Sequence, residues 1–134
     1  MPFVVDASIV AAWALQDEES SHAAEALERL RGEPALAPAL LFFEVRNVLL
    51  VNERRGRLSE GQSTEFLRAL SRLPIRIDRS PDEIHLMTLA RRHRLTVYAA
   101  AYLELALREN LPLVTLDARL EAAMRATNMK PPHV

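Results

Sequence analysis

The sequence has no cysteine, which excludes a disulfide framework and any metal site built on thiolates. A metal ion would therefore have oxygen or histidine ligands, and the composition agrees with a reducing compartment. Glycine is also scarce, with three residues against eight prolines, and neither a glycine-rich phosphate loop nor a GxGxxG motif is present. Lys130 is the only lysine, and a net charge of −1 gives no overall attraction to nucleic acid. A polyanionic substrate would have to be held by local patches and by metal.

Long hydrophobic runs are absent as well. The apolar stretch 3–15 is interrupted by Asp6 and is too short to span a bilayer, and no basic leader precedes it. We therefore expect a cytoplasmic protein with no membrane segment. Hydrophobic residues make up 49% and charged residues 26%, as in ordinary soluble proteins. Because 134 residues fit one hydrophobic core, we expect a single domain over residues 1–134.

Short apolar runs alternate with longer stretches of helical periodicity. The candidate strands are 3–5, 35–37, 75–77 and 113–116, with a weaker one at 129–134. The candidate helices are 8–16, 20–31, 39–55, 60–73, 81–93, 98–109 and 118–126. Strands separated by one or two helices imply right-handed crossovers. The sequence therefore predicts an α/β fold in which a parallel sheet of four to five strands is covered by helices on both faces.

Several helix ends carry recognisable signals. The segments Ser59 to Gln62 and Ser80 to Glu83 both match the capping-box pattern, the second with Pro81 at the first helical position. Gly32 and Gly56 follow helical stretches and are typical of helix stops.

Three carboxylates stand where a fold gains little from them. Asp6 follows the apolar run 3–5 and Asp117 follows 113–116, so each would lie at the carboxyl end of a buried strand, where open parallel sheets carry their chemistry. Either aspartate could be only a helix N-cap, worth about 1 kcal/mol. Glu44 lies inside an apolar helix, where capping cannot explain it and an unpaired buried charge would cost on the order of several kcal/mol. Acids converging on one sheet edge indicate a site for a hard metal ion.

Polar residues stand close to these acids along the chain. Asn47 is one helical turn from Glu44, where it could hydrogen-bond the glutamate or a substrate oxygen. Ser8 and Thr115 each lie two residues from one of the strand-end aspartates, and both could be either local caps or supports for the site. Two arginine clusters, 54–57 and 91–94, end helices, where the helix dipole favours basic residues. They remain the best candidates for phosphate contacts.

Other kinds of site are excluded or poorly supported. The histidines show no metal-ligand spacing and are better explained as surface or helix-end residues. An Asp-x-Asp nucleophile motif is absent, because Ser8 stands where the second aspartate would be. A response-regulator site would need a lysine after a late strand, and Lys130 comes too near the end. The scattered histidines are His22, His85, His93 and His133.

Four segments together resemble the motif blocks of PIN-domain ribonucleases, in particular the VapC toxins of toxin–antitoxin pairs. The segments are 4–8 (VVDAS), 43–49 (FEVRNVL), 95–106 (LTVYAAAYLELA) and 113–120 (LVTLDARL). The resemblance runs over essentially the whole chain in the right order. It implies a PIN-like three-layer α/β/α sandwich, Mg²⁺- or Mn²⁺-dependent endoribonuclease activity, and inhibition by a VapB-like antitoxin. Asp6, Glu44 and Asp117 match the first, second and fourth acids of the pattern, which implies catalytic roles for all three.

The third block departs from the pattern. Such sequences have an aspartate after the first tyrosine, and this one has Ala99 there, so a metal ligand is missing beside Asp6 and Asp117. Without the resemblance, Ala99 is merely a good helix former. Natural decay would be expected to erode several site positions, whereas the other matching residues are in place. We therefore expect an engineered, inactivating substitution that lowers metal affinity and rate without affecting the fold.

Two functions remain open at this point. The first is a metal-dependent toxin ribonuclease weakened by Ala99, and the alternative is a non-catalytic PIN-like module that binds an antitoxin or RNA. The segment 40–51 carries more apolar side chains than one helix face can bury. We therefore expect a homodimer or an antitoxin complex, although burial in the core explains the same pattern nearly as well.

Overall fold

The computed structural model describes residues 1–15 and 20–128. A parallel sheet forms its centre, with the strand order β3-β2-β1-β4. The strands are β1 (Phe3–Val5), β2 (Ala35–Pro38), β3 (Ile75–Asp78) and β4 (Leu113–Val114). β1 lies between β2 and β4, with Phe3 opposite Ala35 and Val4 opposite Leu113. All three residues of β1 are fully buried, which explains its uniformly apolar sequence.

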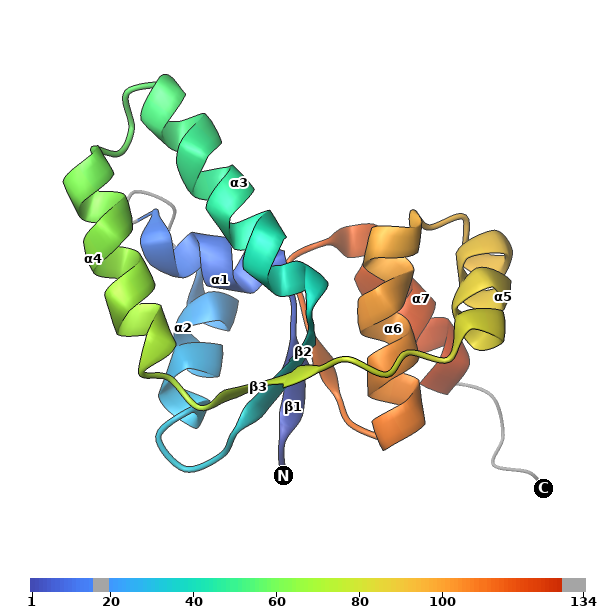
Figure 1. Cartoon of the computed structure of the whole chain (residues 1–134). Coiled ribbons are helices and arrows are strands. Elements are labelled where there is room, and N and C mark those ends of the chain that lie inside the picture. Colours follow the sequence, from blue (N-terminus) through green and yellow to red (C-terminus); the bar gives the residue numbers. More distant parts are fainter. Residues whose placement is uncertain (16–19, 129–134) are drawn as a thin grey trace.

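Helices cover both faces of the sheet. They are α1 (Ala7–Ala14), α2 (Ser21–Arg29), α3 (Leu40–Arg54), α4 (Glu60–Ser71), α5 (Glu83–His93), α6 (Val97–Glu109) and α7 (Ala118–Asn128). Figure 1 shows α1 to α4 on one side of the strands and α5 to α7 on the other. The three-layer α/β/α sandwich expected from the resemblance is therefore confirmed.

The core lies where α3 and α6 meet the two faces of the sheet. α6 packs against β1 and β2 through Leu103 and Ala106, which are both fully buried. On the other face, α3 turns Leu41, Val45 and Leu49 inward at intervals of four residues, the spacing of a helix stripe. Because these helices start near the carboxyl ends of the strands, their first turns border that edge of the sheet.

The sequence located the four described strands and all seven helices, with differences at their ends. The strand expected at 113–116 ends at Val114, and the Leu116 backbone N–H donates to the Ser8 side chain in α1 instead of to a neighbouring strand. The capping box of Ser59 and Gln62 is present, and Gly56 has a positive φ of 75° at the end of α3, where its lack of a Cβ is useful. The strand expected at 129–134 lies outside the described residues, as does Gln16.

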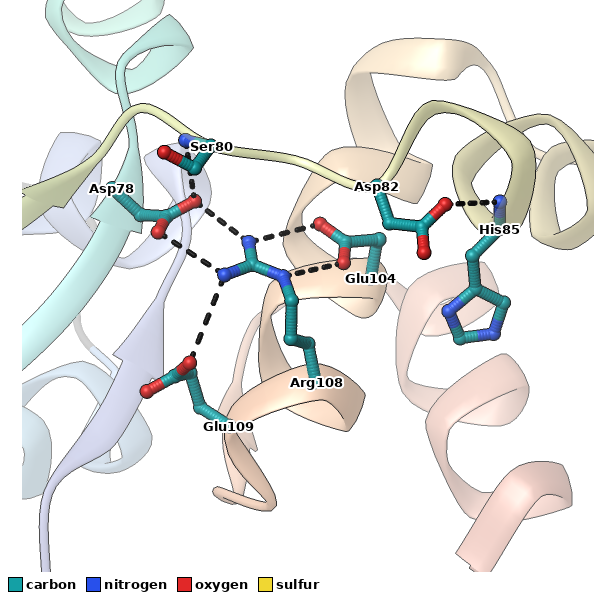
Figure 2. A network of polar contacts seen from close by, with 7 residues as sticks. All are labelled: Asp78, Ser80, Asp82, His85, Glu104, Arg108 and Glu109. Carbon is teal, nitrogen blue, oxygen red and sulfur yellow. Dashed lines mark hydrogen bonds and ion pairs between the residues drawn. The ribbon is translucent and has the colours of Figure 1, made fainter.

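The expected start of α5 needs a correction. Asp82, not Ser80, is the N-cap, and its carboxylate accepts the backbone N–H of His85 at 3.0 Å. Pro81 therefore precedes the helix. The backbone N–H of Ser80 instead donates to Asp78 at 3.4 Å, which holds this segment in the loop after β3 (Figure 2).

A buried ion network joins the end of β3 to α6 (Figure 2). Arg108 donates to both carboxylate oxygens of Glu104, at 2.7 and 3.1 Å, and to both of Asp78, at 3.2 and 2.7 Å. Glu109 lies 3.7 Å from the same guanidinium. Glu104 is fully buried, so its charge depends on this arginine. The network fixes where the chain leaves β3.

No helix among residues 1–15 and 20–128 is long and apolar enough to cross a membrane.

Candidate functional site

Asp6 is built into the junction between β1 and α1. It is the N-cap of α1, and its Oδ1 accepts the Ile9 backbone N–H at 3.2 Å and the Ser8 hydroxyl at 2.6 Å. Its Oδ2 accepts the hydroxyl of Thr115. Only 5% of Asp6 is exposed, and its hydrogen bonds fix the orientation of the carboxylate at the sheet edge. The N-cap explanation is correct for this residue, but it accounts for only one of these three hydrogen bonds.

The loop after β4 brings Asp117 to the same place. The Asp117 N–H donates to Thr115 Oγ1 at 2.9 Å, and the Leu116 N–H donates to Ser8 Oγ at 2.8 Å. Ser8 and Thr115 therefore tie the β1 and β4 loops together, because each hydroxyl also donates to Asp6. Asp117 caps α7 through Oδ1, which accepts the N–H groups of Arg119 and Leu120. Asp117 is exposed to solvent.

Glu44 comes from α3, which lies on the opposite side of the sheet from α7, the helix that Asp117 caps. Its Oε1 accepts the hydroxyl of Tyr102, from α6, at 2.5 Å. Tyr102 is 2% exposed, so the hydroxyl that holds Glu44 is itself fixed by packing in the core. The bond also spans the two helix layers, because α3 and α6 cover different faces of the sheet.

These residues line one pocket of about 280 Å³. Ala99 is in its wall, and the backbone N–H of Ala99 donates to Thr96, the N-cap of α6. The three acids singled out in the sequence, and the alanine of the third block, therefore line one hollow at the carboxyl edge of the sheet. The lining residues are Asp6, Ala7, Ser8, Glu44, Thr96, Tyr98, Ala99, Tyr102, Asp117 and Leu120.

The electrostatics of the pocket disfavour negative charge. Burial raises the pKa of Asp6, and the charge of Asp117 raises it further, against the lowering effect of its hydrogen bonds. Burial also raises the pKa of Glu44, the charge of Asp6 adds to this, and the Tyr102 hydrogen bond opposes both. Burial raises the pKa of Tyr102, so its hydroxyl stays protonated and remains a donor. A bound cation would relieve the cost of holding these carboxylates together.

The donor set fits a hard divalent cation. Asp6 Oδ2 accepts one hydrogen bond and keeps a lone pair, and among the described residues Asp117 Oδ2 and Glu44 Oε2 have no donor at all. Carboxylate oxygens are what Mg²⁺ prefers, and it is usually held by one or two of them with waters and substrate phosphate. Within residues 1–15 and 20–128, however, no group of three Asp, Glu or His side chains is close enough to hold a metal ion. The pocket therefore offers carboxylate oxygens that a hard cation prefers, but it has one carboxylate fewer than the resemblance implies.

The structure also places the remaining sequence candidates. Asn47 is exposed on α3 and does not line the pocket, so a supporting or substrate-contacting role for it stays a prediction. Ser8 lines the pocket, and Thr115 is buried behind it. His22 is exposed and His133 lies outside the described residues. Sequence reasoning missed Tyr102 as a site residue, although it stands in the third motif block.

A separate apolar groove runs beside α3. It is lined by residues of α3, α4 and β3, and Phe42 and Phe43 remain 51% and 70% exposed beside it. Leu41 and Leu49 are buried, so core packing explains part of the apolar content of this helix. The exposed phenylalanines are the part that core packing does not explain.

Known proteins resemble this chain in sequence. The family described as PIN domain matches residues 3–125. Ribonuclease VapC3 of Pyrobaculum aerophilum is 33% identical over 123 residues, which cover 90% of this chain and 92% of that protein. Ribonuclease VapC1 of Mycobacterium tuberculosis is 44% identical over 91 residues, which are 65% of each chain.

Solved structures share the fold. PAE2754 from Pyrobaculum aerophilum superposes with a TM-score of 0.74 at 24% identity, covering 93% of this chain and 86% of that chain. Mycobacterium tuberculosis VapC20, a toxin that cleaves the sarcin-ricin loop, superposes with a TM-score of 0.62 at 13% identity, covering 90% and 94%. At these identities the superpositions concern the fold alone.

Proposed function

Because this chain belongs to the PIN domain family, with VapC ribonucleases among its relatives, we propose that it is the endoribonuclease toxin of a toxin–antitoxin pair, weakened by Ala99. One observation carries the proposal. Asp6, Glu44 and Asp117 come from three separate elements and line a single pocket beside Ala99. Gathering these three acids has an electrostatic cost that helix capping does not require, since burial raises the pKa of two of them.

The residues divide the chemistry between them. Asp6 and Asp117 would hold Mg²⁺ or Mn²⁺, which supplies Lewis-acid stabilisation of the charge that develops on a scissile phosphate. Glu44 would orient an attacking water and accept its proton through Oε2, which has no donor among the described residues. Tyr102 fixes Glu44, while Ser8 and Thr115 fix Asp6 between the two loops. In this chain Ala99 contributes no carboxylate, so cation affinity and rate should both be low.

The substitution Ala99→Asp tests this proposal. We expect Mg²⁺- or Mn²⁺-dependent RNA cleavage to rise by at least about a hundredfold, because even residues that only support metal ligands typically contribute ~10–100-fold. The thermal midpoint should fall slightly in EDTA through like-charge repulsion and rise with added Mg²⁺ by mass action. Ala99→Asn is the matched control, because it has nearly the same size without the charge.

The outcome separates the two functions. Cleavage that appears with Asp and not with Asn, and that EDTA abolishes, supports the nuclease. If Ala99→Asp neither cuts RNA nor changes its melting with Mg²⁺, the protein is instead a non-catalytic module that binds an antitoxin or RNA.

A VapB-like antitoxin and a second copy of the chain are the proposed protein partners. The names of the VapC relatives support the antitoxin. The exposed Phe42 and Phe43 beside the apolar groove support a further protein contact. Sedimentation of the chain over a range of concentrations, alone and after co-expression with the adjacent gene product of its host, tests both. A monomer at every concentration with no co-purifying partner contradicts them.

A further inference from the structure

A second hollow lies close to the carboxylate pocket and is lined by basic side chains. Its lining residues are His93, Arg94, Arg119, Ala122 and Ala123, around about 380 Å³. They come from the end of α5, the residue that follows it, and the first half of α7. Within residues 1–15 and 20–128, no carboxylate pairs with either guanidinium. Two like charges that share a hollow without a counter-ion indicate a site for an anion.

Arg119 lacks the usual structural explanation, and the dipole that favours a cation at Arg94 does not explain the left-handed backbone there. Arg119 is in the first turn of α7, the end where the helix dipole disfavours cations. Arg94 ends α5 in the left-handed region, with φ 54°, where a glycine or asparagine would be less strained. By contrast, the cation near the other end of α7, Arg125, is paired with Glu121 at 2.6 Å.

Residues on both sides of the hollow are close along the chain to residues of the carboxylate pocket. Arg119 donates its backbone N–H to Asp117, and Arg94 stands two residues before Thr96, which lines the carboxylate pocket. Two residues of chain span at most about 7 Å. A phosphate in the basic hollow would therefore be close enough to belong to the same nucleic acid strand as a phosphate in the carboxylate pocket.

We propose that Arg94 and Arg119 bind a backbone phosphodiester of the RNA strand, next to the phosphodiester that faces Asp6 and Asp117. This proposal rests on the proposed nuclease function and adds the residues that position the substrate. Guanidinium groups suit this ligand because they make paired, charge-assisted hydrogen bonds to phosphate oxygens. His93 forms part of the wall, and its buried Nε2 has no hydrogen-bond partner among the described residues.

Binding of a short fluorescein-labelled single-stranded RNA, measured by anisotropy in EDTA over a salt series, tests the proposal on the chain with Ala99. The double variant Arg94→Gln/Arg119→Gln should weaken binding on the order of tenfold or more, as expected for lost hydrogen bonds to a charged group. The slope of log K against log salt should become shallower by at least about 0.7, the value for one phosphate contact on a single strand. The control is Arg68→Gln/Arg125→Gln, which removes the same charge from two exposed ion pairs outside the hollow.

Activity gives a second and separate measurement. In the Ala99→Asp background, the double variant should raise KM with little change in kcat, because the contact is equally strong before and during the reaction. Equal RNA affinity and equal salt slope for the two double variants would overturn the phosphate site and leave the nuclease proposal standing. Selective loss of RNA binding with no cleavage by Ala99→Asp would support the phosphate site and overturn the nuclease. Loss of affinity for an antitoxin peptide without loss for RNA would mean that the hollow binds the partner's carboxylates and not RNA.

Discussion

The Tyr102 hydroxyl donates a hydrogen bond to Glu44 Oε1 over 2.5 Å and so joins the two helix layers across the end of the sheet. Glu44 is on α3 and Tyr102 is on α6, so neither helix can shift without moving the carboxylate. The bond stabilises the ionised form of Glu44 and opposes the effect of burial on its pKa. A general base benefits from this arrangement, because it is fixed in position and its ionised form is stabilised.

Removing this hydroxyl should change the pH dependence of cleavage. In the Ala99→Asp background, Tyr102→Phe should lower kcat on the order of tenfold and move the acidic limb of the kcat profile to higher pH. The pKa of Glu44 rises when the hydrogen bond is lost, so a higher pH is needed to ionise it. A pH–rate profile of the two proteins gives the measurement. An unchanged acidic limb would mean that Glu44 is not the titrating base.

Much of the site was accessible from the sequence, for a physical reason. Asp6 and Asp117 follow buried strands, and the carboxyl ends of parallel strands meet at one edge, so the topology alone brings them together. Tyr102 was not accessible in this way. An aromatic residue on a helix with apolar neighbours is ordinarily core, and only the crossing of α3 and α6 shows that its hydroxyl reaches Glu44. The basic hollow depends likewise on the contact between the α5 end and α7.

Neutralising Glu44 should stabilise the protein when metal is absent. Because burial raises the pKa of Glu44, the folded state binds more protons than the unfolded state above the unfolded pKa of about 4.3. The stability of the parent therefore falls as pH rises through the window from that value to the raised pKa. Glu44→Gln keeps an acceptor for Tyr102 and removes this penalty.

Melting in EDTA tests the expectation. Near neutral pH, Glu44→Gln should melt higher than the parent, because the glutamine carries no charge to be desolvated. Below about pH 4 the difference should disappear, because Glu44 is then protonated in both states. A parent that melts higher near neutral pH would contradict the burial cost.

The sequence alone did not distinguish between two candidate N-caps of α5. Ser80 and Asp82 are both good N-cap residues, and the proline between them favoured Ser80. In the structure the Asp82 carboxylate accepts the His85 N–H, and Ser80 is held outside the helix by Asp78. Asp82→Ala should cost about 1 kcal/mol in the free energy of unfolding, while Ser80→Ala should cost little. Urea titrations of both variants measure this, and equal losses would contradict the assignment.

The ion network of Arg108 on α6 should contribute more to the free energy of unfolding than an exposed ion pair does. Arg108→Met would leave the fully buried Glu104 without its partner (Figure 2). Breaking buried pairs typically costs about 3–5 kcal/mol, and we expect the lower end because Arg108 is 26% exposed. Arg68→Met removes an exposed pair with Glu65 and should cost less than about 1 kcal/mol.

A second variant and the pH dependence refine this prediction. Glu104→Met/Arg108→Met should recover much of the lost stability, because the fully buried carboxylate is then gone and only the more exposed Asp78 is left without its partner. The hydrogen bonds of Arg108 lower the pKa of Asp78, so the contribution of Asp78 is present above its unfolded pKa and is lost as pH falls through the lowered value. Equal unfolding free energies for Arg108→Met and Arg68→Met would show that the network contributes nothing to stability.

The hydroxyl of Thr115 should be needed both for stability and for metal binding. It donates to Asp6 and accepts the Asp117 N–H, so Thr115→Val leaves two polar groups without this partner while the shape is kept. Thr115 is 3% exposed, and buried groups left unpaired cost about 1–3 kcal/mol. Since the Thr115 hydrogen bond lowers the pKa of Asp6, its loss should raise that pKa and weaken cation binding at neutral pH.

In the Ala99→Asp background, we expect Thr115→Val to give a lower melting temperature and an apparent Mg²⁺ affinity weaker by ~10–100-fold, the usual effect of removing a group that orients a metal ligand. Thr115→Ser keeps the hydroxyl and should retain most of both properties. If Thr115→Val matches Thr115→Ser in Mg²⁺ titrations of cleavage, Asp6 does not depend on this hydroxyl to bind the cation.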